Sequence, residues 1–133
     1  MAVYDLAMTM EEIMAPVELL SPGHYRMRYE GLLKDEEGSI FWPTRAGAQS
    51  VKARFRTISP DPVQNGRGVI YQGILGQFSF ANLQKCIPLI QNGKIDDEAG
   101  VGTEIEVDIT HRKVTIDGEE RTFLGWKKIK SAM

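Results

Sequence analysis

The sequence predicts a mainly β domain, a five-stranded barrel with one helix between its third and fourth strands. Three observations support this architecture. Five short segments alternate apolar and polar residues with the two-residue period of a strand. One segment changes to the three- and four-residue spacing of a helix. Glycines fall inside several of the strand segments, where they favour the bends that curve a sheet.

Length and composition describe one small domain. The chain has 133 residues, 42% of them hydrophobic and 26% charged, with a net charge of −2 at pH 7. This acidic balance argues against a protein that coats nucleic acid through its whole surface, but it permits one basic face. A single cysteine, Cys86, excludes an intrachain disulfide and favours a reducing, cytoplasmic setting. No apolar run has the length needed to cross a membrane.

An N-terminal arm is predicted over residues 1–20, followed by a single barrel domain over residues 21–133. The arm contains acidic residues but no lysine or arginine, so it lacks the pattern of a secretory signal. Thr9 and Glu12 have the spacing of a capping box, and Pro16 ends the short helix that follows. Because so short a helix is unstable alone, we expect it to pack on the body or on another subunit.

The first two strands alternate apolar and basic residues. They are predicted in HYRMRYEGLLK (residues 24–34) and VKARFRTI (residues 51–58), with Gly31 at an expected bend or bulge. Tyrosine, methionine, valine and phenylalanine side chains occupy one face of the two segments. The opposite face is basic and consists of Arg26, Arg28, Lys52, Arg54 and Arg56. If the strands pair, these five cations share one outer surface.

The third strand is predicted in VIYQGILG and is followed by the helix, SFANLQKCIPLIQNG, over residues 79–93. Ser79 is the expected N-cap residue, and Gly93 the glycine that follows the last turn. Pro88 removes one backbone hydrogen bond, so the helix either kinks or ends early near Cys86.

The last two strands are predicted in TEIEVDIT and RTFLGWKKI, joined through the turn sequence IDGEE. Glu104, Glu106 and Asp108 face outward as an acidic stripe, which we expect to keep nucleic acid on the other side of the barrel. The apolar residues of TEIEVDIT fall on odd-numbered positions, whereas Val114 and Ile116 in HRKVTI fall on even-numbered ones. This shift by one residue predicts a β-bulge between His111 and Lys113.

Three strands, a helix and two strands form the element order of the OB-fold, a small barrel that commonly binds oligonucleotides. An open antiparallel sheet with the helix on one face fits the same order. In the loop after the first strand, aromatic residues stand beside a cation, the combination that single-stranded nucleic acid needs for base stacking and phosphate contact. The predicted nucleic-acid-binding residues are Arg26, Arg28, Phe41, Trp42, Arg45, Lys52, Arg54, Arg56 and Tyr71.

Each of these assignments has a structural alternative. In these alternatives, the cations would form a solvated outer face without a ligand. Trp42 would pack back over the end of the barrel, and Tyr71 would point into the core. Evidence for catalysis is thin, since the sequence has two histidines and no nucleophile-elbow, P-loop, HExxH or paired-cysteine motif. An enzyme built only from loop carboxylates is the remaining alternative. We therefore predict no enzyme activity, no metal and no cofactor.

The run PVELLSPGHYRMRYEG, the basic strand, GRGVIYQ, the amphipathic helix and the closing DG hairpin resemble small bacteriophage OB-fold proteins that bind single-stranded DNA. This likeness of layout spans residues 16–129. It implies binding of single-stranded DNA during replication or recombination, in the host cytoplasm, together with replication or recombination proteins. The chain departs from bacterial-type single-stranded DNA-binding proteins, which end in an acidic tail, because it ends in KKIKSAM.

Two further alternatives stay open. RNA is an equally suitable ligand for such a face, since contacts with the 2′-hydroxyl leave no sequence motif. A structural or protein-interaction module, such as a virion component or an inhibitor of a host protein, would instead use the methionine-rich arm and the exposed aromatic residues as an interface. We expect a homo-oligomer, with a dimer favoured.

Overall fold

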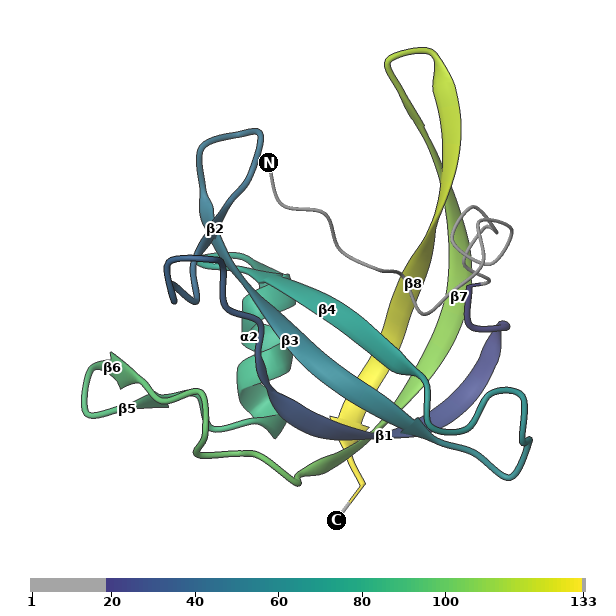
Figure 1. Ribbon diagram of the computed structural model, residues 1–133, viewed down its shortest axis with the longest axis horizontal. Helices are drawn as coiled ribbons and strands as arrows, with labels where there is room; N and C mark the ends of the chain where they lie inside the picture. The colour runs from purple at the N-terminus through teal and green to yellow at the C-terminus, as the bar shows by residue number, and fades with distance from the viewer. Residues whose placement is uncertain (1–18, 133) are drawn as a thin grey trace, which may run out of the picture.

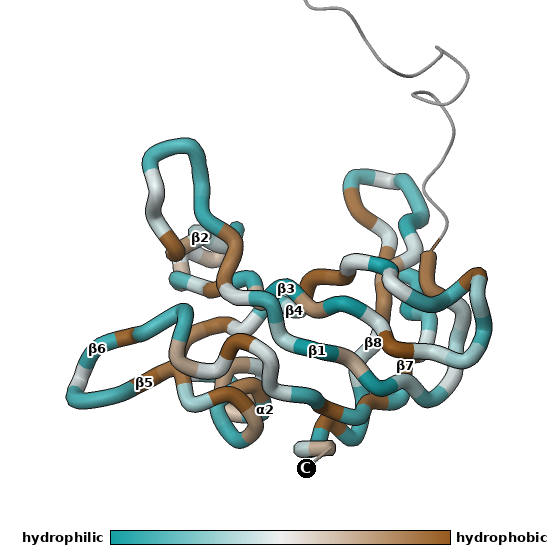
Figure 2. Tube along the Cα trace, turned by 60° about the horizontal axis from the view of Figure 1, so that its bottom comes forward, coloured by the Kyte–Doolittle hydropathy of each residue, from teal (hydrophilic) through white to brown (hydrophobic). Residues whose placement is uncertain are grey.

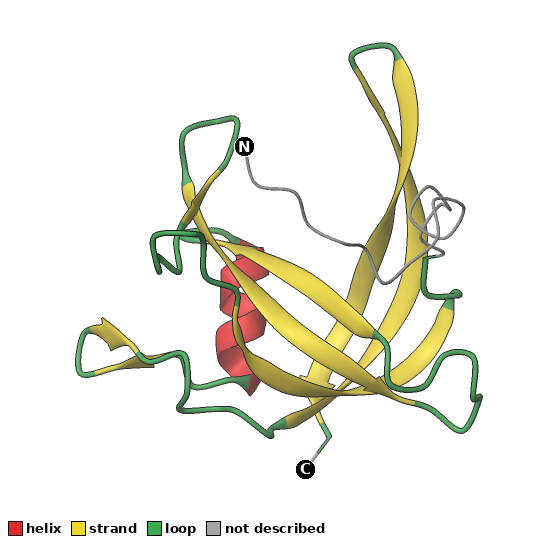
Figure 3. Cartoon of the chain, in the orientation of Figure 1, coloured by secondary structure: helices red, strands yellow, loops and turns green. Residues whose placement is uncertain are grey.

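The computed structural model describes residues 19–132, which form an antiparallel sheet and one short helix (Figures 1 and 3). The helix predicted after Thr9 lies outside the described residues. In chain order the elements are β1 (Gly23–Leu32), β2 (Trp42–Pro43), β3 (Gln49–Ile58), β4 (Gly68–Ile74), α2 (Phe78–Cys86), β5 (Ile90–Gln91), β6 (Lys94–Ile95), β7 (Glu104–Ile116) and β8 (Glu119–Ser131). The mainly β class and the five long strands predicted from alternation are confirmed.

The five long strands lie in the order β4–β3–β1–β7–β8, and every pairing is antiparallel. Within residues 19–132, β4 and β8 form no ladder with each other, so the closed barrel that the sequence predicts is not found. The rings of Tyr71 on β4 and Trp126 on β8 meet edge to face instead, with their centroids 5.1 Å apart.

The core lies on the inner face of the coiled sheet, as the alternation predicts. Tyr25, Met27 and Tyr29 are buried from β1, as are Val51, Ala53 and Phe55 from β3. Phe55 contacts the rings of both Tyr29 and Trp126, at centroid distances of 5.7 Å. This aromatic chain connects β1 and β3 to β8 across the interior, so apolar packing holds the sheet in its curved shape.

The bulge predicted at Gly31 is confirmed. Between Tyr29 and Gly31 the pairing of β1 with β3 shifts register, and Gly31 has φ +111°. Such a backbone conformation favours glycine, because a side chain there would clash with the chain. The bulge bends β1 near its end and leads the chain into the loop that carries β2.

The helix ends at Cys86, just before Ile87 and Pro88, so of the two alternatives left open by Pro88 the early end is confirmed. Residues 90–95 form the small β5–β6 hairpin, whose turn is hydrophilic (Figure 2). Gly93 belongs to this turn, with φ +74°, and does not cap the helix. The predicted Ser79 N-cap is also wrong, since Gln77 takes that position and Ser79 Oγ accepts a hydrogen bond from Ile74 N at 2.9 Å.

The β-bulge predicted near His111 is wrong. β7 runs without interruption, and the register shift with β8 lies between Glu106 and Asp108, beside Lys128 with φ +55°. β1 stops pairing with β7 at Ile109, and beyond that point β7 and β8 project as a two-stranded ribbon (Figure 1). The last buried residue of β7 is Ile109, so the apolar residues beyond it need not keep the alternation of the body.

Candidate nucleic-acid interface

Cations from β1 and β3 lie on the outer face of the sheet, as predicted. Arg28 stands directly opposite Arg56 in the ladder, and both side chains are about half exposed. The alternation with buried residues places the other three predicted strand cations, Arg26, Lys52 and Arg54, on the same side. The two strands therefore do present a basic surface.

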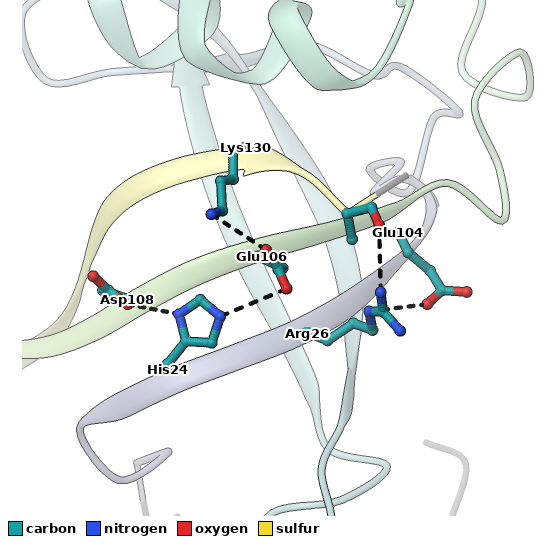
Figure 4. A network of polar contacts seen from close by, with 7 residues as sticks. His24, Arg26, Glu104, Glu106, Asp108 and Lys130 are labelled. Carbon is teal, nitrogen blue, oxygen red and sulfur yellow. Dashed lines mark hydrogen bonds and ion pairs between the residues drawn. The ribbon is translucent and has the colours of Figure 1, made fainter.

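Carboxylates from the same chain pair with much of this surface. β7 lies beside β1, with Arg28 opposite Glu104. Glu104 Oε1 is 3.5 Å from Arg26 Nε, and its Oε2 is 3.7 Å from Arg28 Nη2 (Figure 4 shows the contact with Arg26). Arg56 Nε in turn lies 3.1 Å from Glu30 Oε2. The expectation that the acidic stripe lies on the far side of the protein is wrong.

The acidic stripe is engaged on both of its flanks. His24 Nδ1 lies 2.8 Å from Asp108 Oδ1, and Lys130 Nζ of β8 lies 3.5 Å from Glu106 Oε2 (Figure 4). The hydrogen bond from His24 holds the pKa of Asp108 below its usual value. β7 thus carries a row of carboxylates between two rows of cations.

Three predicted cations have other surroundings. Lys52 Nζ lies 4.1 Å from the ring centroid of Trp42, and Arg54 Nη2 donates to the backbone oxygen of Glu30 at 3.1 Å. Arg45, at the tip of the β2–β3 hairpin, lies 3.9 Å from Asp117 at the tip of the β7–β8 ribbon, and both side chains are almost fully exposed. Such an exposed pair contributes little free energy. These three cations keep most of their capacity to meet an anion.

The predicted aromatic residues differ in accessibility. Phe41 is exposed, whereas Trp42 is half-buried, with Nε1 donating to Leu33 O at 3.1 Å and Lys52 above its ring. Tyr71 is buried and donates its hydroxyl hydrogen to Ser79 O at 2.8 Å, and burial raises its pKa. Tyr71 therefore points inward, and Trp42 packs against β3.

A groove that the sequence pattern did not reveal lies between β4, the start of α2 and the β7–β8 ribbon. It has a volume of about 1270 Å³, and Trp126 and Tyr71 line its floor. Its apolar lining is unusually accessible, with exposed fractions of 87% for Phe78, 48% for Ile70 and 44% for Phe123. Arg112 lines the same groove and stands opposite Phe123 in the β7–β8 ladder.

Sequence reasoning missed these residues for identifiable reasons. Phe78 immediately precedes the predicted helix and has no periodicity of its own. Phe123 is an aromatic residue within a predicted strand, and that pattern fits a buried core position as well as an exposed one. Ile70 belongs to an apolar run, VIY, in which alternation does not separate the two faces.

Comparisons of the chain with family models, with curated proteins and with solved structures find no match. Over residues 19–132, no helix has the length and apolar character to span a membrane, and no three metal-ligating side chains converge.

Proposed function

We propose that the protein binds single-stranded DNA without catalysis, along the outer face of β3 and β4 and into the groove beside them. The strand order, with the helix between β4 and β7, supports an OB-like topology whose β4–β8 seam is open. In OB-folds, oligonucleotides lie over the second and third strands between two loops. Here these positions correspond to β3, β4, the loop of residues 33–48 and the tip of the β7–β8 ribbon.

One observation carries the proposal: exposed aromatic rings and a cation share a groove that adjoins the β3 cations. In the ladder, Ile70 of the groove is the direct partner of Arg54, and Gln72 is the direct partner of Lys52. A strand of nucleic acid could place phosphates on Lys52 and Arg54 and stack bases on Phe78 and Phe123. Stacking on an aromatic side chain contributes about 1–3 kcal/mol per base, whatever the base.

The test is a fluorescence-anisotropy titration of the full chain with labelled oligo-dT at several salt concentrations. Arg54→Glu is expected to lower the affinity at least tenfold, because it reverses a charge at the centre of the proposed track. The matched control is Lys94→Glu on the β5–β6 hairpin, which makes the same change on a different part of the surface. Equal affinities for the two variants would refute this site. An oligo-rU arm of the same length decides between DNA and RNA.

A protein-interaction module is the second candidate, and the pairing of β1 cations with Glu104 favours it. Carboxylates that already neutralise a basic face weaken its attraction for phosphate. The apolar groove then serves a protein partner, in a virion component or an inhibitor of a host protein. Tight complex formation with a protein, without any shift of oligonucleotides, would favour this role. Light scattering of the free chain tests the predicted dimer in the same samples.

A further inference from the structure

The groove has a free strand edge along one side. Within residues 19–132, β4 pairs only with β3. In an antiparallel ladder, every second residue directs its backbone N–H and C=O toward the neighbouring strand. Leu75 N donates to Gln49 O, so residues 69, 71 and 73 of β4 also direct their backbone groups toward β3. Those of Ile70 and Gln72 therefore point toward the groove. Ile74 belongs to the same outward series, and its N–H is occupied by Ser79 Oγ. An unpaired edge of this kind accepts an added strand.

The chain enters the described structure at this groove. Leu19 lines it, and Leu20 is buried, with its carbonyl oxygen 2.8 Å from Nε2 of His111 on the ribbon. These contacts anchor the end of the segment formed by residues 1–18. Extended at about 3.3 Å per residue, that segment reaches roughly 59 Å. The seven residues of β4 span only about 23 Å, so the segment is long enough to follow the whole edge.

Composition makes this segment complementary to the groove. Residues 1–18 contain four carboxylates and no lysine or arginine, while Arg112 lines the groove and the β3 cations lie next to it. Within VYDLAM, an extended chain would place Tyr4, Leu6 and Met8 on one side. That apolar side matches the exposed aliphatic and aromatic lining of the groove.

We propose that residues 1–18 dock in the groove of the same chain, with residues 3–8 added as a strand to the free edge of β4. Tyr4, Leu6 and Met8 then cover the open seam between β4 and β8, and the carboxylates of the segment meet the neighbouring cations. Docking within one chain is favoured over docking on a second copy, because the connection through Leu19 gives a high effective concentration.

Docking has a functional consequence that rests on the proposed nucleic-acid binding. The segment and single-stranded DNA would occupy the same groove, and both are anionic, so each would displace the other. The docking itself requires no nucleic acid.

Amide hydrogen exchange of the full-length chain, followed by NMR, tests the docking directly. The Ile70 and Gln72 amides should exchange about tenfold or more slowly in the wild type than in L6D/M8D, which disrupts the groove-facing side. The matched control, V3D/A7D, adds the same charge on the opposite side and should retain the protection. The Tyr71 amide, which bonds to β3, should exchange at the same rate in all three proteins and so reports on folding.

Rapid exchange of Ile70 and Gln72 in the wild type, or equal effects of the two double variants, would overturn the proposal. Protection that falls on dilution would also overturn it, because the strand would then come from a second copy. An oligo-dT titration separates the two hypotheses: L6D/M8D should bind at least threefold more tightly than V3D/A7D. If neither variant binds DNA, the proposed function fails, while the exchange data still decide the docking.

Discussion

Replacing Glu104 with glutamine should strengthen nucleic-acid binding, because this one carboxylate pairs with two cations. Its oxygens lie 3.5 Å from Arg26 Nε and 3.7 Å from Arg28 Nη2. The substitution keeps the size of the side chain and removes its charge. Both guanidinium groups then become available on the outer face, one strand away from Arg54.

The size of the effect follows from counting phosphate contacts. Among residues 19–132, four cations on the proposed track have no close carboxylate that is shielded from solvent: Arg45, Lys52, Arg54 and Arg112. Single strands give a slope of about −0.7 per contact in log K against log salt, so four contacts predict about −3. Releasing Arg26 and Arg28 raises the number to six and the slope to about −4.

Anisotropy titrations with oligo-dT at four or more salt concentrations measure both slopes. Glu98→Gln is the matched control, since it removes the same charge from an exposed residue in the segment before β7. Thermal unfolding should change little, because partly exposed ion pairs contribute about 0–1 kcal/mol each. An unchanged slope for E104Q would refute the reasoning and place Arg26 and Arg28 outside the interface.

Three further predictions concern the groove, the core and the charged network. Phe78→Ala and Phe123→Ala should each weaken oligo-dT binding by about 1–3 kcal/mol at an unchanged melting temperature, while Val101→Ala leaves binding intact. Gly73→Val should lower the free energy of unfolding in urea by about 1–3 kcal/mol, because a Cβ there would lie 3.2 Å from Phe80 Cα; Gly68→Ala, which meets nothing within 4 Å, should cost less than half as much. Asp108, whose pKa is lowered in the folded state by His24, stabilises the protein above the ordinary aspartate pKa of about 3.9 and ceases to do so as the pH falls through the lowered value. Asp108→Asn should therefore reduce stability at neutral pH and flatten the acid side of the melting-temperature profile; a parallel profile would contradict this.

Strand positions and faces followed from the sequence because they depend on local alternation. The inner residues of β1 and β3, the outer cations and the Gly31 bulge were all read from a two-residue period and a glycine. The sequence did not determine where the helix ends, because Pro88 is compatible both with a kinked helix and with an early end near Cys86. The arrangement beyond Ile109 was missed because local alternation assumes that one face stays buried, whereas β7 has no buried residue after Ile109.

The candidate site was less predictable, because it depends on contacts between distant segments. Phe78 and Phe123 line the same groove although more than forty residues separate them in the chain, and no local pattern connects the two. Closure of the barrel was likewise undetermined by element order. It depends on whether β4 and β8 approach within hydrogen-bonding distance, which is set by contacts between distant segments such as that of Tyr71 with Trp126.

Like charges on neighbouring strands are tolerated here because an acidic strand lies beside them. The ladder sets Arg26 opposite Glu106 and Arg28 opposite Glu104, and on the other flank it sets Glu106 opposite Lys130. Opposite charges directly across neighbouring strands stabilise the pairing of β1 with β7. The carboxylates thus have a structural role on β1 and β7. Because their influence decreases with distance from β7, the uncompensated positive charge lies toward β3, next to the groove. A polyanion that uses this face would therefore contact β3 and β4 more strongly than β1.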